Sequence, residues 1–437
     1  MNQLRHHPAD EFRGICSIPF WLRAPFLFFA SCVGSALLAW YLPQQAYIME
    51  WRVSKYFETS DLLLVAGSVF TLVIGFWVGS FRSQRLLPLP VEPDPILGNL
   101  AVFASVITYF GYAAWFGLAA FRGLRPWHVY YAIFGNDLRF VYSLRTGYME
   151  TVSGVTTTTQ FGIAAVLLCS LAFWNQPKIF RWLVYPLVIL SVLRAVLNSE
   201  RLSILELIIP LGIMWLRLNL FGRPVSRLTL LRLMILPFVV IAAVFILFVG
   251  MESLRSWQHY RQSSDSLLEF AALRFGGYYI TSMNNGALLL DHPGDQPLPY
   301  YTIEWFWRLP LISNIISYEQ ITGIQPLSEF HDMLVTYANP EFNNPGGFFV
   351  ILTDLGMIGG LSLIFFLGIV SGVLYTSFVL GRLSGLLFYP TVIMCGLEMP
   401  RFFYYGSHRN LPSLLFLFLT ILLTARLFNH RAEFRTN

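Results

Sequence analysis

Hydrophobic residues occur in long blocks along this chain, and shorter polar stretches separate the blocks. A helix of roughly 20 apolar residues crosses about 30 Å of hydrocarbon. Blocks of this kind lie at Ala24–Leu42, Asp61–Phe81, Gly98–Phe121, Val155–Trp174, Trp182–Asn198, Ser203–Phe221, Leu231–Met251, Phe348–Leu380, Leu383–Glu398 and Leu411–Phe428. The pattern predicts an all-α, polytopic integral membrane protein with about ten transmembrane helices.

The composition supports the same class. Of the 437 residues, 56% are hydrophobic and only 12% are charged, whereas soluble domains carry roughly 25% charged residues. No basic stripe of the kind that tracks nucleic acid is present, so we expect no nucleic-acid partner. The four cysteines lie in the N-terminal tail or within the blocks, which indicates neither a disulfide framework nor a metal-thiolate site.

Short loops rich in Lys and Arg mark the cytoplasmic side of a membrane protein. With the N-terminus inside, the inner segments hold Arg5, Arg13, Arg23, Arg82, Arg85, Lys178, Arg181, Arg217, Arg223, Arg227, Arg232, Arg382, Arg426, Arg431 and Arg435. Few carboxylates accompany them, so the pattern predicts that both termini are cytoplasmic. The block Phe348–Leu380 is too long for one upright helix, but two crossings would place Arg382 outside. We therefore expect one crossing with a kinked outer end.

This topology places three substantial segments outside, at Arg122–Gly154, Glu252–Pro345 and Met399–Asn410. The long middle segment is rich in Leu, Phe, Tyr and Trp, which suits helices that lie on the membrane surface or pack over a cavity. The chain is accordingly divided into seven N-terminal membrane helices (1–251), a large outer loop (252–345) and three C-terminal membrane helices (346–437).

Arg201 and Glu200 lie between two apolar blocks, where an ionised side chain costs about 2.5–3.5 kcal/mol and usually marks an anionic partner or a polar cavity. Arginine also grips phosphate oxygens with a planar, bidentate fork. Arg194 would share a face with Arg201 if the helix ran unbroken through Ser199. Arg201 has two interpretations: it binds an anion, or it forms a structural salt bridge with Glu200 or Glu206.

Two other arginines are candidates for the same role. Arg274 lies in the apolar stretch Phe270–Tyr279, either as an anion ligand or as a snorkelling surface residue. Arg401 lies beside Glu398 at the exit of a block, where a local ion pair and anion binding are both open.

Three outward-facing residues could act as an acid or a base: Glu200, Asp354 and His331. Asp354 lies inside an apolar block, where a carboxylate needs a partner or a bound proton. The sequence contains no phosphate-binding glycine loop, nucleophile elbow or zinc motif. We therefore expect no metal and no cofactor. An outer site has no access to nucleotide-activated sugars, so a lipid-linked pyrophosphate sugar is the donor that fits.

The C-terminal third contains the run Phe342-Asn-Asn-Pro-Gly-Gly-Phe-Phe-Val-Ile-Leu-Thr-Asp-Leu-Gly-Met-Ile-Gly-Gly360. This run resembles the Asp-Phe-Gly-x-x-Gly region of bacterial oligosaccharide repeat-unit polymerases (O-antigen polymerase, Wzy type), although Leu355 stands where an aromatic residue is usual. The stretch Asn198-Ser-Glu-Arg-Leu-Ser-Ile-Leu205 is similar to the Ser-x-Arg helix start of the same family.

The resemblance implies a membrane glycosyltransferase of the GT-C-like class in the bacterial inner membrane, with its site on the periplasmic face. The growing glycan on undecaprenyl pyrophosphate would be transferred onto a hydroxyl of an incoming lipid-linked repeat unit. Membrane lipid, a chain-length regulator and a flippase are the other partners that it implies. A departing pyrophosphate needs preorganised positive charge, and an acceptor hydroxyl needs a base. The hypothesis assigns the pyrophosphate to Arg194, Arg201, Arg274 and Arg401, and the base role to Glu200, Asp354 or His331.

Two rival interpretations are open. A lipid-oligosaccharide flippase or other transporter would also hold charges inside a bundle, but it favours broken helices and repeated halves. O-antigen ligases are related transferases with a His-Asn-type motif, whereas Asn344, Pro345 and Gly346 occupy that stretch here without a histidine.

Overall fold

The computed structural model describes residues 19–82, 95–134, 143–152, 154–198, 200–220, 226–255, 257, 266–294, 296–313 and 315–436. These residues form helices and the segments that connect them, and no strand occurs among them. The all-α class predicted from the sequence is therefore confirmed for the part of the chain that the structure describes.

Eight of the described helical segments are long and apolar enough to cross a membrane, and they correspond to the first eight predicted blocks. The first consists of α2 (Ala24–Phe28), η2 (Phe29–Val33) and α3 (Gly34–Tyr41), and the fourth of η6 (Thr156–Phe161) and α9 (Gly162–Phe173). The others are α5 (Thr59–Arg82), α6 (Pro95–Phe121), α10 (Pro177–Asn198), α11 (Leu202–Leu220), α12 (Arg227–Arg255) and α19 (Gly347–Val379). The last two blocks form α20 (Leu383–Glu398) and α21 (Leu411–Thr436), whose apolar parts are shorter. The molecule is thus a polytopic helical membrane protein.

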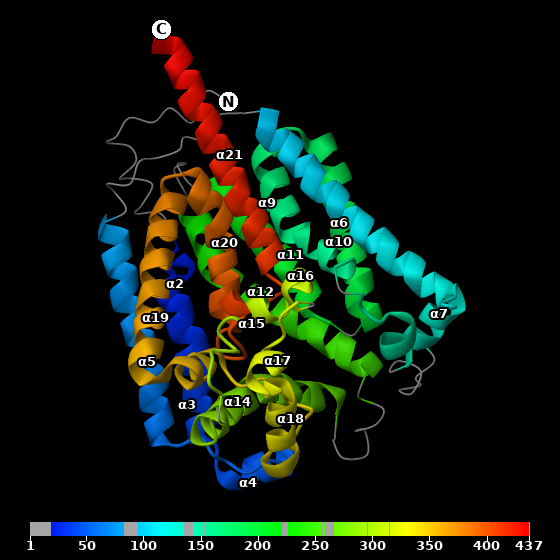
Figure 1. Ribbon diagram of the computed structural model, residues 1–437, viewed down its shortest axis with the longest axis vertical. Helices are drawn as coiled ribbons and strands as arrows, with labels where there is room; N and C mark the ends of the chain where they lie inside the picture. The colour runs from blue at the N-terminus through cyan, green and yellow to red at the C-terminus, as the bar shows by residue number, and fades with distance from the viewer. Residues whose placement is uncertain are drawn as a thin grey trace.

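The long helices run up and down along one axis of the molecule (Figure 1). The end of α21 lies at the top of Figure 1. The lower part of Figure 1 carries α4 (Gln44–Ala46), α14 (Leu267–Asp291), α17 (Tyr318–Thr322) and α18 (Pro326–Tyr337). The other short elements are η3 (Tyr47–Trp51), α7 (Pro126–Phe134), η5 (Leu144–Tyr148), α15 (Glu304–Trp307), α16 (Pro310–Ser313) and η7 (Tyr404–Gly406).

α14 lies across the lower end of the bundle, between the upright helices and α18 (Figure 1). Its Asn284 side chain is fully buried and fixes a segment of the chain just before α5. The Asn284 Oδ1 atom accepts hydrogen bonds from the amides of Tyr56 (2.7 Å) and Phe57 (3.1 Å), and its Nδ2 donates to the Ser54 carbonyl (2.9 Å). α14 is therefore built into the bundle instead of belonging to a separate domain.

α19 contains the kink that the sequence predicted for this overlong block. Gly356 has φ 68° and ψ 176° inside the helix, a backbone conformation that glycine adopts far more readily than other residues. The part before the kink carries Asp354, and residues 357–379 continue as a separate straight segment. One element can thus both cross the bundle and turn a carboxylate toward the loops at its end.

α5 and α19 pack with their backbones in contact. Gly75 and Gly79 on α5 face Gly368 and Gly372 on α19, two glycines four residues apart on each helix. A Cβ atom added at Gly372 would lie 2.1 Å from the backbone oxygen of Phe76, which is far inside van der Waals contact. Small residues of this spacing allow close helix approach in a membrane, where dispersion contacts hold helices together.

Candidate functional site

Three arginines from distant parts of the chain converge on one aromatic ring. Arg201 precedes α11, Arg274 lies on α14 and Arg401 follows α20. The centroid of the Tyr278 ring lies 4.7 Å from the guanidinium carbon of Arg201, 5.6 Å from that of Arg401 and 5.9 Å from that of Arg274. We call these four residues the Tyr278 cluster. Three of the four arginines proposed from the sequence to bind pyrophosphate therefore lie together.

The Tyr278 ring can gather cations because its face carries partial negative charge. Arg274 and Tyr278 are four residues apart on α14, so they share one face of that helix. Arg201 is also 4.0 Å from the centroid of the Phe248 ring on α12. Its guanidinium group thus lies against two aromatic rings, and a ring attracts the group without neutralising its charge.

Three carboxylates, two of them buried, hold the arginines of the Tyr278 cluster in place. Glu252, at the end of α12, is only 1% exposed; its carboxylate lies 2.8 Å from Arg274 Nε and 3.7 Å from Arg201 Nη2. Glu341 accepts a hydrogen bond from Arg274 Nη2. Glu398 pairs with Arg401 at 2.7 Å, which confirms the local ion pair that the sequence left open. Three guanidinium groups and three carboxylates therefore balance one another.

The arginines stay charged although they are shielded from water. Burial opposes the charge of Arg274, but the hydrogen bond to Glu341 and the nearby Glu252 raise its pKa above the ordinary value. Burial also opposes the charge of Arg401, and the neighbouring Glu398 raises its pKa. Arg274 and Arg401 therefore stay charged beside their carboxylates in a fixed geometry.

Tyr279 lies beside these charges and keeps its proton. Burial, with a smaller effect of Glu398, raises the pKa of Tyr279 to about 12, although Arg401 and Arg201 act in the opposite direction. At neutral pH its hydroxyl group is therefore protonated and can donate a hydrogen bond, but it is not a base.

A second group of charges lies at the junction of α10 and α11, and we call it the Glu200 cluster. Arg194 donates two hydrogen bonds to Glu200 Oε2, at 3.1 and 2.9 Å. Arg409 donates to the other oxygen of Glu200, and its Nε donates to Glu206 at 3.0 Å. The hydroxyl group of Tyr404 also donates to Glu206, at 2.8 Å. These five residues link α10, α11 and the segment between α20 and α21.

Arg194 and Arg201 do not share a helix face, because α10 ends at Asn198 and α11 begins only at Leu202. Ser199, the residue expected to interrupt the helix, lies outside the described residues. Arg194 belongs to the Glu200 cluster, whereas Arg201 pairs with the more distant Glu252. The shared face considered in the sequence analysis is therefore wrong.

The three candidate bases lie in different places. Glu200 is engaged by Arg194 on one oxygen and by Arg409 on the other. Asp354 Oδ2 accepts hydrogen bonds from the amide (2.6 Å) and the hydroxyl group (2.8 Å) of Thr302, which supplies the partner that this carboxylate required. His331 is exposed on α18, and no hydrogen bond or ion pair joins it to either cluster among the described residues. Glu200 is the only one of the three within a cluster.

Several residues of the two clusters gave no signal in the sequence. Glu252, Glu341 and Arg409 look like ordinary loop charges at the ends of apolar blocks, and Tyr278 looks like one aromatic residue among many. A spacing argument could link Arg274 to Tyr278 but could not bring either of them to Arg401. The contacts depend on how α11, α14 and α20 pack, which the pattern of the chain does not encode locally.

Among the described residues, no group of three His, Cys, Asp or Glu side chains is placed to hold a metal ion. Comparison of the whole chain with known proteins gave no match to a family model, to a curated protein or to a solved structure.

Proposed function

We propose that this protein is a membrane-embedded glycosyltransferase that polymerises lipid-linked oligosaccharides at the periplasmic face of the bacterial inner membrane. It transfers a growing glycan from undecaprenyl pyrophosphate onto a hydroxyl group of an incoming lipid-linked repeat unit and releases undecaprenyl pyrophosphate. The observation that carries the proposal is the convergence of Arg201, Arg274 and Arg401 on Tyr278.

This arrangement suits a pyrophosphate that develops charge as it leaves a sugar carbon. Guanidinium forks bind phosphate oxygens in pairs, and donors fixed before the reaction need no reorganisation during it. The ion pairs with Glu252, Glu341 and Glu398 keep the arginines oriented in the resting state. An arriving diphosphate then replaces these carboxylates as the acceptor of hydrogen bonds from the arginines.

The position of the cluster supports a lipid-linked substrate. Arg201 lies at the start of α11 and Arg401 at the end of α20, so the charges are level with the ends of apolar helices. A diphosphate at that level leaves its polyprenyl chain in the hydrocarbon and its sugars among the elements that follow α12. The bias of Lys and Arg toward the other end supports a periplasmic position for this end.

The base that activates the acceptor hydroxyl is assigned to Glu200, Asp354 or His331. Glu200 is next to Arg201 in the chain and is the one candidate base that pairs with arginines in the described part of the chain. Two hydrogen bonds from Arg194 and one from Arg409 stabilise the ionised carboxylate, so one of these bonds opens when Glu200 removes a proton from substrate. Asp354 and His331 would act on an acceptor bound nearer to α18.

The test uses a bacterium in which the chromosomal gene is deleted and plasmid copies are supplied. Arg201→Ala should abolish long polymer and leave single repeat units on the exported carrier lipid. Arg308→Ala is the matched control, because Arg308 is 45% exposed and pairs with the neighbouring Glu304; its chain-length distribution should equal that of the wild type. Each variant is compared at equal membrane abundance.

Other outcomes separate this proposal from its rivals. Repeat units trapped on the cytoplasmic side after gene deletion would indicate a flippase, and polymer retained on the carrier lipid would indicate a ligase. Normal polymer from Arg201→Ala would exclude the role assigned to the Tyr278 cluster.

A further inference from the structure

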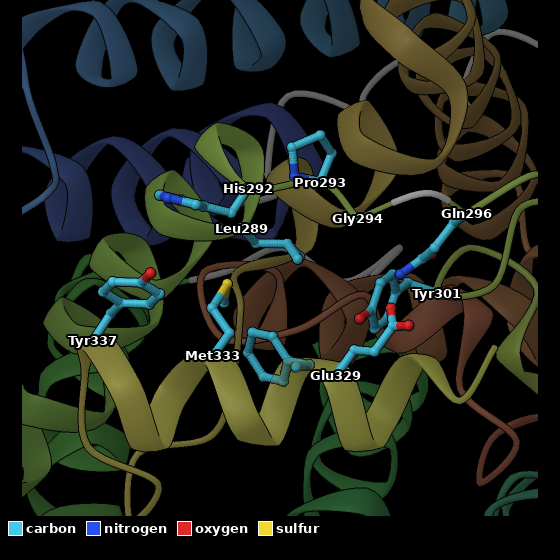
Figure 2. A pocket seen from close by; sticks show the side chains of 10 residues that line it. Leu289, His292, Pro293, Gly294, Gln296, Tyr301, Glu329, Met333 and Tyr337 are labelled. Atoms are coloured by element: carbon cyan, nitrogen blue, oxygen red, sulfur yellow. The ribbon is translucent and has the colours of Figure 1, made fainter.

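A separate pocket lies between the end of α14 and α18, with a volume of about 420 Å³. Figure 2 shows Glu329, Met333 and Tyr337 extending from α18 toward Leu289, with Tyr301 and Gln296 beside Glu329. Leu289 is almost fully buried and forms part of an apolar floor, whereas Tyr337 is 46% exposed at the rim. The pocket therefore has an apolar base and a polar, accessible edge.

The chemistry of this lining differs from that of the two charged clusters. The pocket has no Arg or Lys among its lining residues. Its ionisable side chains are those of Glu329, His292 and two tyrosines. A phosphate or a uronic acid would meet the Glu329 carboxylate without a compensating cation. Aromatic faces combined with carboxylate, amide and imidazole groups suit a ring with apolar C–H faces and many hydroxyl groups.

The walls of the pocket are fixed in place by contacts of their own. The Tyr301 hydroxyl group donates to the Pro326 carbonyl at 3.2 Å, and the next residue, Thr302, is held by Asp354. The rings of His292 and Tyr337 are stacked, with their centroids 5.4 Å apart. A pocket organised in advance loses little conformational entropy when a ligand binds.

α14 connects this pocket to the Tyr278 cluster. Tyr278 and Leu289 lie on the same helix, and the eleven-residue interval between them corresponds to about 16 Å at the rise of an α-helix. That length exceeds one sugar ring, so the pocket would hold a sugar of the glycan other than the one attached to a diphosphate at Tyr278.

We propose that the pocket formed by Leu289, His292, Tyr301, Glu329, Met333 and Tyr337 binds a sugar ring that carries no acidic group, within the glycan of the lipid-linked substrate. The identity of that glycan rests on the proposed function, in which it is the substrate of the polymerase. Tyr301 and Tyr337 contact the faces of the ring, and Glu329 and Gln296 bind its hydroxyl groups.

The experiment measures saccharide binding directly, with no carrier lipid present. Full-length protein in nanodiscs is probed by saturation-transfer NMR with galactose, N-acetylglucosamine, glucosamine and glucuronate. We expect saturation of ring protons from at least one of the first three sugars and the weakest signal from glucuronate. The ring contacts predict that Tyr337→Ala lowers the affinity about two- to tenfold.

Two tryptophan variants on α18 form a matched pair. Met333→Trp fills the pocket and should abolish the saturation signal, whereas Val335→Trp adds the same bulk at a 60% exposed position and should leave it unchanged. Equal signals from the two variants, a preference for glucuronate, or no binding of any of the four sugars would overturn the proposal.

The variant Arg201→Ala distinguishes a failure of the sugar-pocket proposal from a failure of the proposed function. This variant should bind sugars as the wild type does, because Arg201 is not part of the pocket. If Arg201→Ala still made long polymer while Met333→Trp lost sugar binding, the role assigned to the Tyr278 cluster would fail and the sugar pocket would stand. If Arg201→Ala lost polymer while Met333→Trp kept full sugar binding, the pocket alone would fail.

Discussion

The carboxylate of Glu252 lies 2.8 Å from Arg274 Nε, and Glu252 is only 1% exposed. The same carboxylate also faces Arg201 at 3.7 Å. One buried anion at the end of α12 thus orients two of the three arginines around Tyr278, and removal of its charge changes both.

Glu252→Gln should reduce stability strongly, because removing one partner from a buried ion pair leaves a buried charge uncompensated and costs about 3–5 kcal/mol. The measurement is the thermal unfolding midpoint of purified protein in one detergent. Glu150→Gln is the matched control, since Glu150 pairs with Arg122 at 3.7 Å but is 66% exposed, and it should change the midpoint little. Equal midpoints for the two variants would show that the charge of Glu252 contributes no more to stability than that of the exposed Glu150.

Tyr278→Phe should preserve polymer length, whereas Tyr278→Ala should shorten it. Phenylalanine keeps the ring face that attracts the guanidinium groups, and alanine removes about 0.5–2 kcal/mol of attraction for each well-placed cation. The measurement is the chain-length distribution of the product, with both variants at equal membrane abundance. A loss in Tyr278→Phe as large as that in Tyr278→Ala would instead assign the role to the hydroxyl group.

Asp354→Asn and Thr302→Val should each lower stability by about 1–3 kcal/mol, because a buried hydrogen bond to a charged group is weakened or lost. The double variant should lose less than the sum of the two, since both changes remove one interaction. Thr353→Val is the neighbouring control: its hydroxyl oxygen is buried without a hydrogen-bond partner in the described part of the chain, so this change should cost nothing. If the two losses of stability simply added in the double variant, an energetic coupling between Asp354 and Thr302 would be excluded.

Gly372→Ala should destabilise the bundle, since the added Cβ would lie 2.1 Å from the backbone oxygen of Phe76 and α5 and α19 would have to separate. Gly67→Ala, also on α5, meets nothing within 4 Å and should stabilise the protein by about 0.5–1 kcal/mol, because alanine is the better helix former. Unfolding midpoints of the two variants on either side of the wild-type value would support this packing. A higher midpoint for Gly372→Ala would contradict it.

The helices could be predicted from the sequence because their signal is local. Each apolar block is a property of consecutive residues, and a block too long for one crossing already indicated the kink that Gly356 provides. The boundaries moved by a few residues where caps and prolines, such as Pro95 at the start of α6, determine the first turn.

The candidate site could be predicted only in part, because its partners are distant in the chain. Arg201, Arg274 and Arg401 stood out as charges in apolar surroundings, but Arg409 and Glu200 are 209 positions apart and meet only in the folded bundle. The break between α10 and α11 also redirected Arg201 away from Arg194. A spacing rule assumes an unbroken helix and fails where the helix ends.

Of the eight helical segments that could cross a membrane, α12 has the least contact with the rest of the protein. Only 11% of its apolar stretch is buried inside the protein. Phe238, which is 71% exposed, and its neighbours therefore contact lipid tails where other helices contact protein. A helix whose environment is mostly lipid adjusts its tilt to the thickness of the bilayer. Because Glu252 lies at the end of this helix, we expect a change in the thickness of the surrounding membrane to shift the carboxylate between Arg201 and Arg274.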